Sequence, residues 1–171
     1  MLRPFATALL MVGMALPAMA QNSAEAGPVL LEDWGTFTAS SESDVPAPGS
    51  HTGQLGQTNA ETPLLRSSVI CAGRGTRFGI KIRLRNGLGF DEFDVAIEID
   101  HPAITNSDGQ LQTRDDFNTV IEAGRAGWKG WLFEDPKNFK SGTWTWVVRH
   151  DGAVYLRKSF DVRFHCDAPV A

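Results

Sequence analysis

The chain has 171 residues, a formal net charge of −4 and 42% hydrophobic residues, which suits one domain of ordinary size. Its lysines and arginines form no cluster. A mildly acidic chain of this kind lacks the positive surface with which proteins neutralise nucleic-acid phosphates. We therefore expect no nucleic-acid partner.

The first twenty residues have the pattern of a secretory signal peptide. Arg3 supplies the positive charge, residues 5–16 are almost wholly apolar, and Ala18-Met19-Ala20 offers a cleavage site after Ala20. The apolar stretch is shorter than the roughly 20 residues that a membrane span needs. The sequence therefore predicts a signal peptide at 1–20 and a single domain at 21–171. We expect a periplasmic or secreted protein of a bacterium that is not membrane-embedded.

Two segments of different character open the mature chain. Residues 29–38 are largely apolar and predict an edge strand, whereas the stretch from Ser40 to Pro63 is rich in Ser, Gly, Pro, Thr and Gln. Such a composition offers little to bury. The sequence therefore predicts a flexible loop at 40–63.

Beyond Pro63 the apolar residues alternate with polar ones, which is the period of a β-strand with one buried face. The apolar faces of the first two segments are Phe78, Ile80, Ile82, Leu84 and Phe93, Val95, Ile97, Ile99. The opposite faces are basic in the first segment and acidic in the second. The two segments either pair directly, which would join these charges, or belong to different sheets.

Asp151-Gly152 marks a hairpin between residues 143–149 and 153–164. A two-residue loop would set Val148 beside Tyr155 and mix the faces. A three-residue loop, 150–152, pairs Val148 with Val154 and places Gly152 where a left-handed backbone is needed. We therefore expect the three-residue turn.

Further strands are expected at about 115–122 and 128–134, and the mature chain shows no helical periodicity. Short alternating strands separated by turn residues favour a two-sheet sandwich over a barrel. The predicted fold is all-β, an immunoglobulin-like β-sandwich of about seven to eight antiparallel strands.

The chain has two cysteines, Cys71 and Cys166. In a protein sent to an oxidising compartment, a disulfide between them is the expected state. The alternatives are a reactive thiol or a metal ligand, although neither cysteine lies in a C-x-x-C or Cys/His cluster.

The four histidines, His51, His101, His150 and His165, are isolated in sequence and are interpreted as polar surface residues. No pair has the spacing of a metal site, and no catalytic serine or phosphate-binding motif is present. Residues 106–109 resemble half of a calcium loop but are interpreted as a β-turn. We expect no catalytic residues, no metal and no cofactor.

Six aromatic residues lie close together in the sequence: Trp128, Trp131, Phe133, Phe139, Trp144 and Trp146. Core packing accounts for Trp144 and Trp146, which share the buried face of the hairpin. Trp128 and Trp131 have opposite parity in a regular strand, so at most one points inward. We expect the other to be exposed, and both are candidate contacts for a partner or ligand.

Four segments carry a family resemblance: Phe78-Gly79-Ile80, residues 98–102 (EIDHP), residues 130–136 (GWLFEDP) and residues 141–146 (SGTWTW). Over about residues 29 to 165, interrupted by the segment from Ser40 to Pro63, the chain resembles a bacterial family catalogued as domain of unknown function 3859. The resemblance implies an exported sandwich-like domain with no established activity and no catalytic residues to transfer. The two cysteines are not part of its pattern.

These observations favour a non-enzymatic interaction or structural module of the bacterial cell envelope, whose partner is an unknown envelope protein or a polysaccharide. A carbohydrate-binding module is the alternative, for which two or more exposed coplanar Trp rings are required. An exported hydrolase built from Asp and His residues on loops is a further alternative.

Overall fold

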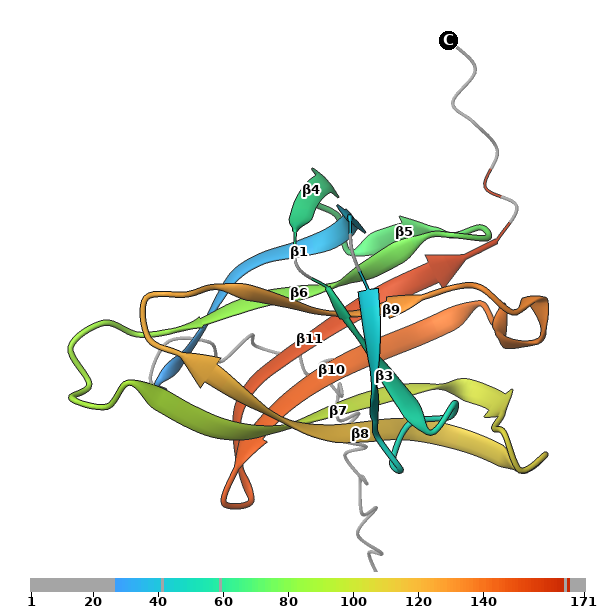
Figure 1. Cartoon of the computed structure of the whole chain (residues 1–171). Coiled ribbons are helices and arrows are strands. Elements are labelled where there is room, and N and C mark those ends of the chain that lie inside the picture. The colour runs from blue at the N-terminus through green and yellow to red at the C-terminus, as the bar shows by residue number, and fades with distance from the viewer. Residues whose placement is uncertain (1–26, 41, 59, 165, 167–171) are drawn as a thin grey trace, which may run out of the picture.

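The computed structural model of the chain describes residues 27–40, 42–58, 60–164 and 166, and the predicted signal peptide lies outside them. The described residues form eleven strands. These strands build two facing sheets and a separate hairpin (Figure 1). The first sheet has the order β4 (Glu61–Leu65), β1 (Val29–Ala39), β6 (Arg77–Leu84), β9 (Gly127–Leu132). The second has the order β5 (Val69–Cys71), β11 (Ala153–Arg163), β10 (Gly142–His150), β7 (Glu92–Thr105), β8 (Leu111–Glu122). The hairpin consists of β2 (Glu42–Pro46) and β3 (Gln54–Thr58), and one 3₁₀ turn spans Pro136–Asn138.

The all-β sandwich predicted from the alternation is confirmed, with three differences in detail. The structure has eleven strands rather than seven or eight. Strand β1 is not an edge strand, because β4 pairs with its outer side. The short strand β5 runs parallel to β11, so the pairing is not entirely antiparallel. Within the described residues, no helix has the length and apolar character needed to cross a membrane.

Phe78 lies at the centre of the core between the two sheets. Its side chain is fully buried, and its ring packs edge-on against Trp144, Trp146 and Phe160 at centroid distances of 5.0 to 5.8 Å. Phe78 comes from β6 and the three partners from β10 and β11. Aromatic pairs of this geometry are favourable beyond their buried area, so this cluster holds the two sheets together.

The two alternating segments of the sequence lie in different sheets, as β6 and β7. The alternative in which their charges face each other is therefore wrong. On the outer face of the first sheet, Lys81 and Arg83 both contact Glu32 of the neighbouring strand. On the other sheet, Glu98 contacts Arg149 and Arg114. Each sheet thus balances its own exposed charges.

The hairpin between β10 and β11 has a two-residue turn, so the predicted three-residue turn is wrong. Asp151 and Gly152 both have positive φ, 47° and 78°, as a type I′ turn requires. A β-bulge at Tyr155 then restores the register, because Arg149 pairs with Val154 and Val148 with Leu156. The bulge, rather than a longer turn, keeps Val148 and Leu156 on the buried face.

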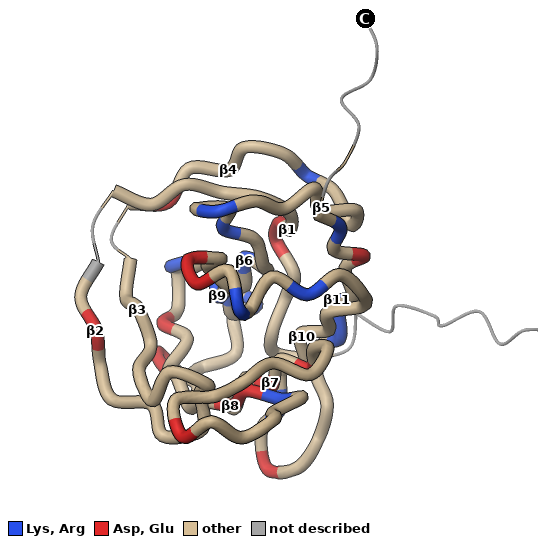
Figure 2. Tube along the Cα trace, turned by 90° about the vertical axis from the view of Figure 1, so that its right-hand side faces the viewer, with Lys and Arg blue, Asp and Glu red and all other residues tan. Residues whose placement is uncertain are grey.

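The segment predicted as a flexible loop at 40–63 contains β2, β3 and the start of β4, so that prediction is wrong. Val45 pairs with Leu55 in the hairpin, Leu55 packs against the core, and Ala47 is buried in it. Few apolar residues suffice here because the two sheets supply the rest of the core. Figure 2 shows the hairpin at one side of the sandwich, between the sheet that carries β4 and the sheet that carries β8.

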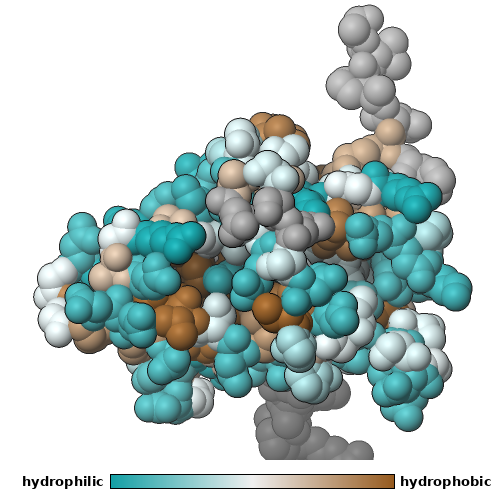
Figure 3. All heavy atoms as spheres, viewed as in Figure 1, coloured by the Kyte–Doolittle hydropathy of each residue, from teal (hydrophilic) through white to brown (hydrophobic). Residues whose placement is uncertain are grey.

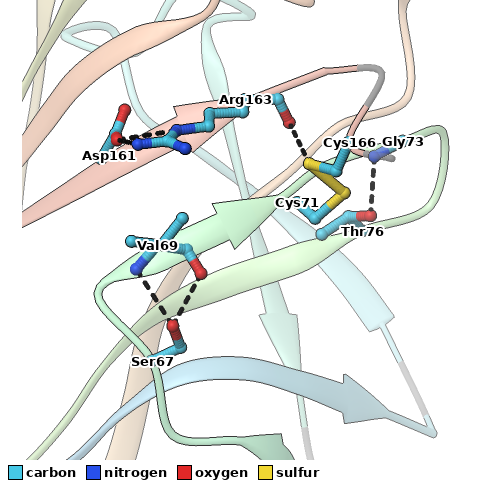
Figure 4. Close-up of a disulfide and its surroundings, with 8 residues drawn as sticks. All are labelled: Ser67, Val69, Cys71, Gly73, Thr76, Asp161, Arg163 and Cys166. Carbon is cyan, nitrogen blue, oxygen red and sulfur yellow. Dashed lines mark hydrogen bonds and ion pairs between the residues drawn. A yellow bond between two sulfur atoms is a disulfide. The ribbon is translucent and has the colours of Figure 1, made fainter. Parts of the chain in front are cut away.

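The predicted disulfide is confirmed. Cys71 at the end of β5 is bonded to Cys166, 95 residues further along the chain, beyond the end of β11 (Figure 4). Strand β5 has three residues, and its pairing partner is the end of β11, where Arg163 lies opposite Cys71. The bond therefore fastens a short edge strand that has little pairing of its own.

We predict that the double variant Cys71→Ser/Cys166→Ser unfolds more easily. A cross-link over a loop of this length lowers the entropy of the unfolded chain, which corresponds to about 4 to 5 kcal/mol of folding free energy as an upper figure. Urea denaturation of the oxidised protein and the double variant measures the difference. Reduced wild-type protein should match the double variant, and equal midpoints for all three would contradict the prediction.

Candidate functional site

The open side of the sandwich lies between β8 and β9. These strands are consecutive in the chain and each forms the edge of its sheet, but they do not pair with each other. The β2–β3 hairpin stands across the gap in Figure 1. Its connecting loop is fastened to β8, because the N–H of Asp116 donates to the carbonyl of Gly49 at 3.1 Å. A Cβ at Gly49 would lie 2.4 Å from that strand's backbone, so only glycine allows this approach.

A groove of about 680 Å³ lies beneath the hairpin, lined by residues of β3, β8 and β9. This volume falls in the range of sites for small molecules. Apolar residues that border the groove are Leu55, Ile82, Ile99, Phe117 and Ile121. On the face seen in Figure 3, hydrophilic residues dominate and apolar ones show only as separate spots. The groove is lined by polar and apolar residues alike, and Ile82, Ile99, Phe117 and Ile121 belong to the buried core.

Trp128 and Trp131 are both buried, each with 6% of its surface exposed, so the expectation of one exposed ring is wrong. The prediction that the two side chains leave opposite faces of the strand is confirmed. Trp131 lies across from the core residue Phe78, and Trp128 lies across from Lys81 on the outer face. The outer ring is covered because Phe37 stacks on Trp128 at 4.4 Å. Both tryptophans line the groove.

Gly130 makes this cover possible. A Cβ at Gly130 would lie 2.6 Å from two atoms of the Phe37 ring, so the ring occupies the space that a side chain would need.

The other tryptophans are covered as well. Trp144 and Trp146 are fully buried, and Trp34 is covered by Arg66 at 3.8 Å. The described residues therefore offer no pair of exposed coplanar Trp rings, and the carbohydrate-binding interpretation loses the platform that it requires.

Asp115 of β8 joins two histidines at one end of the groove. His51, in the hairpin loop, donates its backbone N–H and its Nδ1–H to Oδ2 at 2.9 and 2.8 Å. His101 of β7 reaches Oδ1 at 3.2 Å, and Gln112 donates to the same oxygen at 2.7 Å. The ring of His51 stacks on Trp131 at 4.4 Å. The network therefore holds the hairpin loop over the groove.

The network carries charge inside the protein. Burial alone would raise the pKa of Asp115, but the hydrogen bonds from His101 and His51 outweigh it and hold this pKa below its usual value. His101 Nδ1 also contacts the carbonyl of Pro102 at 2.9 Å. Both ring nitrogens of His101 thus contact oxygen atoms of the protein. The side chain of His101 is fully buried, so its interpretation as a surface residue is wrong.

Lys129 lies on the inner face of β9 with Trp131. Its Nζ donates to the hydroxyl of Thr119 at 3.0 Å. Burial lowers the pKa of Lys129 and Arg125 lowers it further, whereas the negative charges of Glu61 and Glu122 act in the opposite direction. The indole N–H groups of Trp128 and Trp131 are buried without an acceptor among the described residues. Two indole N–H groups beside the groove therefore lack a protein acceptor among the described residues, whereas Lys129 has one hydroxyl partner.

The His51–Asp115 pair resembles part of a hydrolytic triad, but it lacks a nucleophile. Among the hydrogen bonds of the described residues, none joins the His51 ring to a hydroxyl or thiol. A general base without a group to activate does not make a nucleophilic site. The same residues hold no group of three His, Cys, Asp or Glu side chains that could bind a metal ion.

The remaining candidates lie elsewhere. His150 donates from Nδ1 to the carbonyl of Asp94 at 2.6 Å and packs on Phe93, and it is not one of the residues that line the groove. His165 lies outside the described residues. Residues 106–109 form the predicted turn, in which the Asn106 side chain accepts from the N–H groups of Asp108 and Gln110.

The sequence interpretation missed His51, Asp115 and Lys129 as parts of one site. His51 and Asp115 are 64 residues apart, so no spacing rule connects them. For Lys129 a signal exists, because it shares parity with Trp131 and must point inward wherever Trp131 does. A lysine at a core-facing position of a strand is uncommon and could have marked the groove.

Comparisons with known proteins bear on the fold rather than on this groove. The family model described as "Domain of unknown function (DUF3859)" matches residues 30–162. The crystal structure of an immunoglobulin-like protein from Pseudomonas aeruginosa is similar, with a TM-score of 0.52 and 23% sequence identity over 85% of this chain and 99% of that one. This likeness identifies the fold as immunoglobulin-like. No curated protein matches the chain in sequence.

We predict that Asp115→Asn lowers the free energy of unfolding by about 1 to 3 kcal/mol at pH 5.5, because an amide cannot accept all the hydrogen bonds that the buried carboxylate makes with His51, His101 and Gln112. The folded-state pKa of Asp115 lies below its usual value, so its stabilisation is present above about pH 4 and is lost as the pH falls through the folded pKa. Urea denaturation between pH 5.5 and 3 should therefore show the two proteins converging. A constant difference over this range would contradict the prediction.

We predict that Gly130→Ala displaces Phe37 from Trp128 and destabilises the protein by about 1 to 3 kcal/mol through overpacking. Gly127→Ala on the same strand is the matched control, because no atom lies within 4 Å of the added Cβ. Thermal unfolding and tryptophan fluorescence measure both effects. Equal melting temperatures for the two variants would show that the Phe37 ring moves aside freely.

Proposed function

The chain belongs to the DUF3859 family, a family defined without a function, and we propose that it is a non-enzymatic binding module of the bacterial cell envelope. The single observation that supports this most is the groove between the edge strands β8 and β9. It has the volume of a binding site, and its buried donors lack acceptors among the described residues. Among the described residues, no hydroxyl or thiol is hydrogen-bonded to the ring of His51 in its His51–Asp115 pair.

The proposal includes export to the periplasm or the exterior. It is supported by the signal-peptide pattern at 1–20 and by the disulfide between Cys71 and Cys166, a bond that persists in oxidising compartments. A scaffold with a covalent cross-link and a fastened hairpin is suited to holding a ligand in a fixed geometry. The module would act by binding a component of the envelope and presenting or storing it unchanged.

We predict that the protein isolated from the envelope fraction of a bacterium carries a bound component that Thr119→Trp excludes. Thr119 lines the groove, so an indole at this position would fill it. Thr113→Trp, at an exposed position of the same strand, is the matched control and should retain the component. Native mass spectrometry measures the bound mass.

The same preparation separates binding from catalysis. After incubation of the complex, the released component should have an unchanged mass. Conversion of the component would support an enzyme instead, and a protein that captures nothing from an envelope extract would contradict the proposal. Equal retention by Thr119→Trp and Thr113→Trp would place the binding site away from the groove.

A further inference from the structure

The groove follows two strands along their whole length. Every residue of β9 and every residue of β3 lines it, and β3 lies between β2 and β9 in Figure 2. A strand of six residues such as β9 is about 20 Å long at roughly 3.3 Å per residue. A groove that accompanies β9 over this length offers room along an extended chain.

The direction of the backbone groups of β9 is fixed at its end. Phe133, directly after β9, donates its N–H to the carbonyl of Thr76 at 3.0 Å and accepts from the N–H of Gly75 at 2.7 Å. Both partners precede β6, which pairs with β9 in a regular antiparallel register. The backbone groups of Phe133 therefore face the β6 side of the strand.

Three residues of β9 turn their backbone groups the other way. In an antiparallel strand the N–H and C=O groups of successive residues face opposite edges, so those of Trp128, Gly130 and Leu132 face the groove. Within the described part of the chain, no strand pairs with this edge of β9. A row of donors and acceptors at this spacing is complementary to the backbone of another extended chain.

The facing edge of β8 is less available for such pairing. The N–H of Asp116 already donates to the carbonyl of Gly49 at 3.1 Å, and the side chain of Gln112 donates to the same carbonyl at 3.2 Å. The hairpin loop thus occupies the first half of this edge. Strand β9 is therefore the edge to which a further strand would be added.

The charge of the groove selects the kind of chain. Six carboxylates line it against three lysine and arginine side chains, so its formal charge is negative. A cleft lined mainly by one sign of charge concentrates ligands of the opposite sign. The carboxylates are Asp44, Glu61, Asp115, Glu122, Glu134 and Asp135, and the cations are Arg77, Arg125 and Lys129.

Two of the carboxylates are open to a ligand. Asp44 of β2 and Glu134, which follows β9, are both exposed, and neither side chain has an ion pair or hydrogen bond among the described residues. Lys129 lies between the sheets and donates to the hydroxyl of Thr119. The positive side chains of a bound chain would therefore be directed to Asp44 and Glu134.

We propose that the groove binds an extended, lysine- or arginine-bearing segment of a partner protein, which adds to β9 as a further strand of the first sheet. This inference rests on the proposed function and names the partner class of the same site. The backbone groups of Trp128, Gly130 and Leu132 hold the segment, and the carboxylates select its charge. A small amine would match the carboxylates but leave the row of backbone groups unpaired.

The first test compares three capped hexapeptides with the full mature protein. One has the repeating sequence Thr-Lys, the second has the repeating sequence Thr-Glu, and the third is the lysine peptide N-methylated at every amide. We expect the lysine peptide to bind about tenfold or more tightly than either of the others, since one loses the charge and the other loses the backbone donors. Isothermal titration calorimetry measures the three affinities.

Hydrogen exchange of individual amides locates the added strand. With the lysine peptide in excess, the amides of Trp128, Gly130 and Leu132 should exchange about tenfold more slowly or less. Those of Lys129 and Trp131 face β6 and should be unchanged. A peptide held only by its side chains would not produce this alternation along β9.

The double variant Asp44→Asn/Glu134→Gln tests the charge selection. It should bind the lysine peptide about threefold or more weakly than the wild type does. The matched control is Asp91→Asn/Glu92→Gln, at two exposed positions that do not line the groove, and it should bind as the wild type does. The comparison of the three peptides needs no variant, so it holds even where a variant fails to fold.

Four results would overturn the inference: no binding of the lysine peptide, equal affinities for the lysine and glutamate peptides, undiminished binding after N-methylation, or protection of Asn118 and Val120 on β8 instead of the β9 amides. An envelope-derived component that Thr119→Trp excludes but that is not a peptide would also overturn it, while leaving the proposed function intact. The proposed function itself fails where that component is absent, converted or retained by Thr119→Trp.

Discussion

The packing of Phe78 against the rings of β10 and β11 is the constraint on which the rest of the structure depends. The cluster joins the sheets near their middle strands, since β6 lies next to the edge of one sheet and β10 at the centre of the other. Away from it, the distance between the sheets is set by what fills the space. On the side of β8 and β9, the hairpin and its loop fill the space between the sheets only in part, and a groove remains.

The groove exists because β8 and β9 separate after the short connection at 123–126 instead of forming a hairpin. Each strand keeps its other neighbour, β7 or β6. Among the described residues, the sides that face the gap pair with no further strand, although Asp116 of β8 is bonded to Gly49 of the hairpin loop. Exposed edges of this kind invite pairing with other chains. The loop before β3 covers one end of the gap, where Asp115 holds His51 against Trp131. Structural closure and the candidate site therefore depend on the same residues.

The alternation of side chains was sufficient to predict which faces are buried, because Phe78, Ile80, Ile82 and Leu84 follow a period of two. It could not predict register or sheet membership. A bulge at Tyr155 gives the same burial pattern as a longer turn, and β2 and β3 carry too few apolar residues to be recognised without the sheets that they cover. The site was the least predictable part, since His51 and Asp115 meet only through the fold.

Two lysines of the described residues, Lys129 and Lys158, point into this sandwich, and their surroundings differ. Lys158 lies on the inner face of β11 opposite Trp146, and burial lowers its pKa. Its ammonium donates to the Ser68 hydroxyl at 2.6 Å and lies 4.4 Å from the centre of the Trp34 ring. The negative face of an indole compensates a buried cation in the way that water or a carboxylate would. Lys129 has a comparable hydroxyl partner but no such ring contact among the described residues, and it opens onto a cavity instead. Lys158 is thus satisfied by side chains of the protein, whereas Lys129, which is only partly buried, faces the groove.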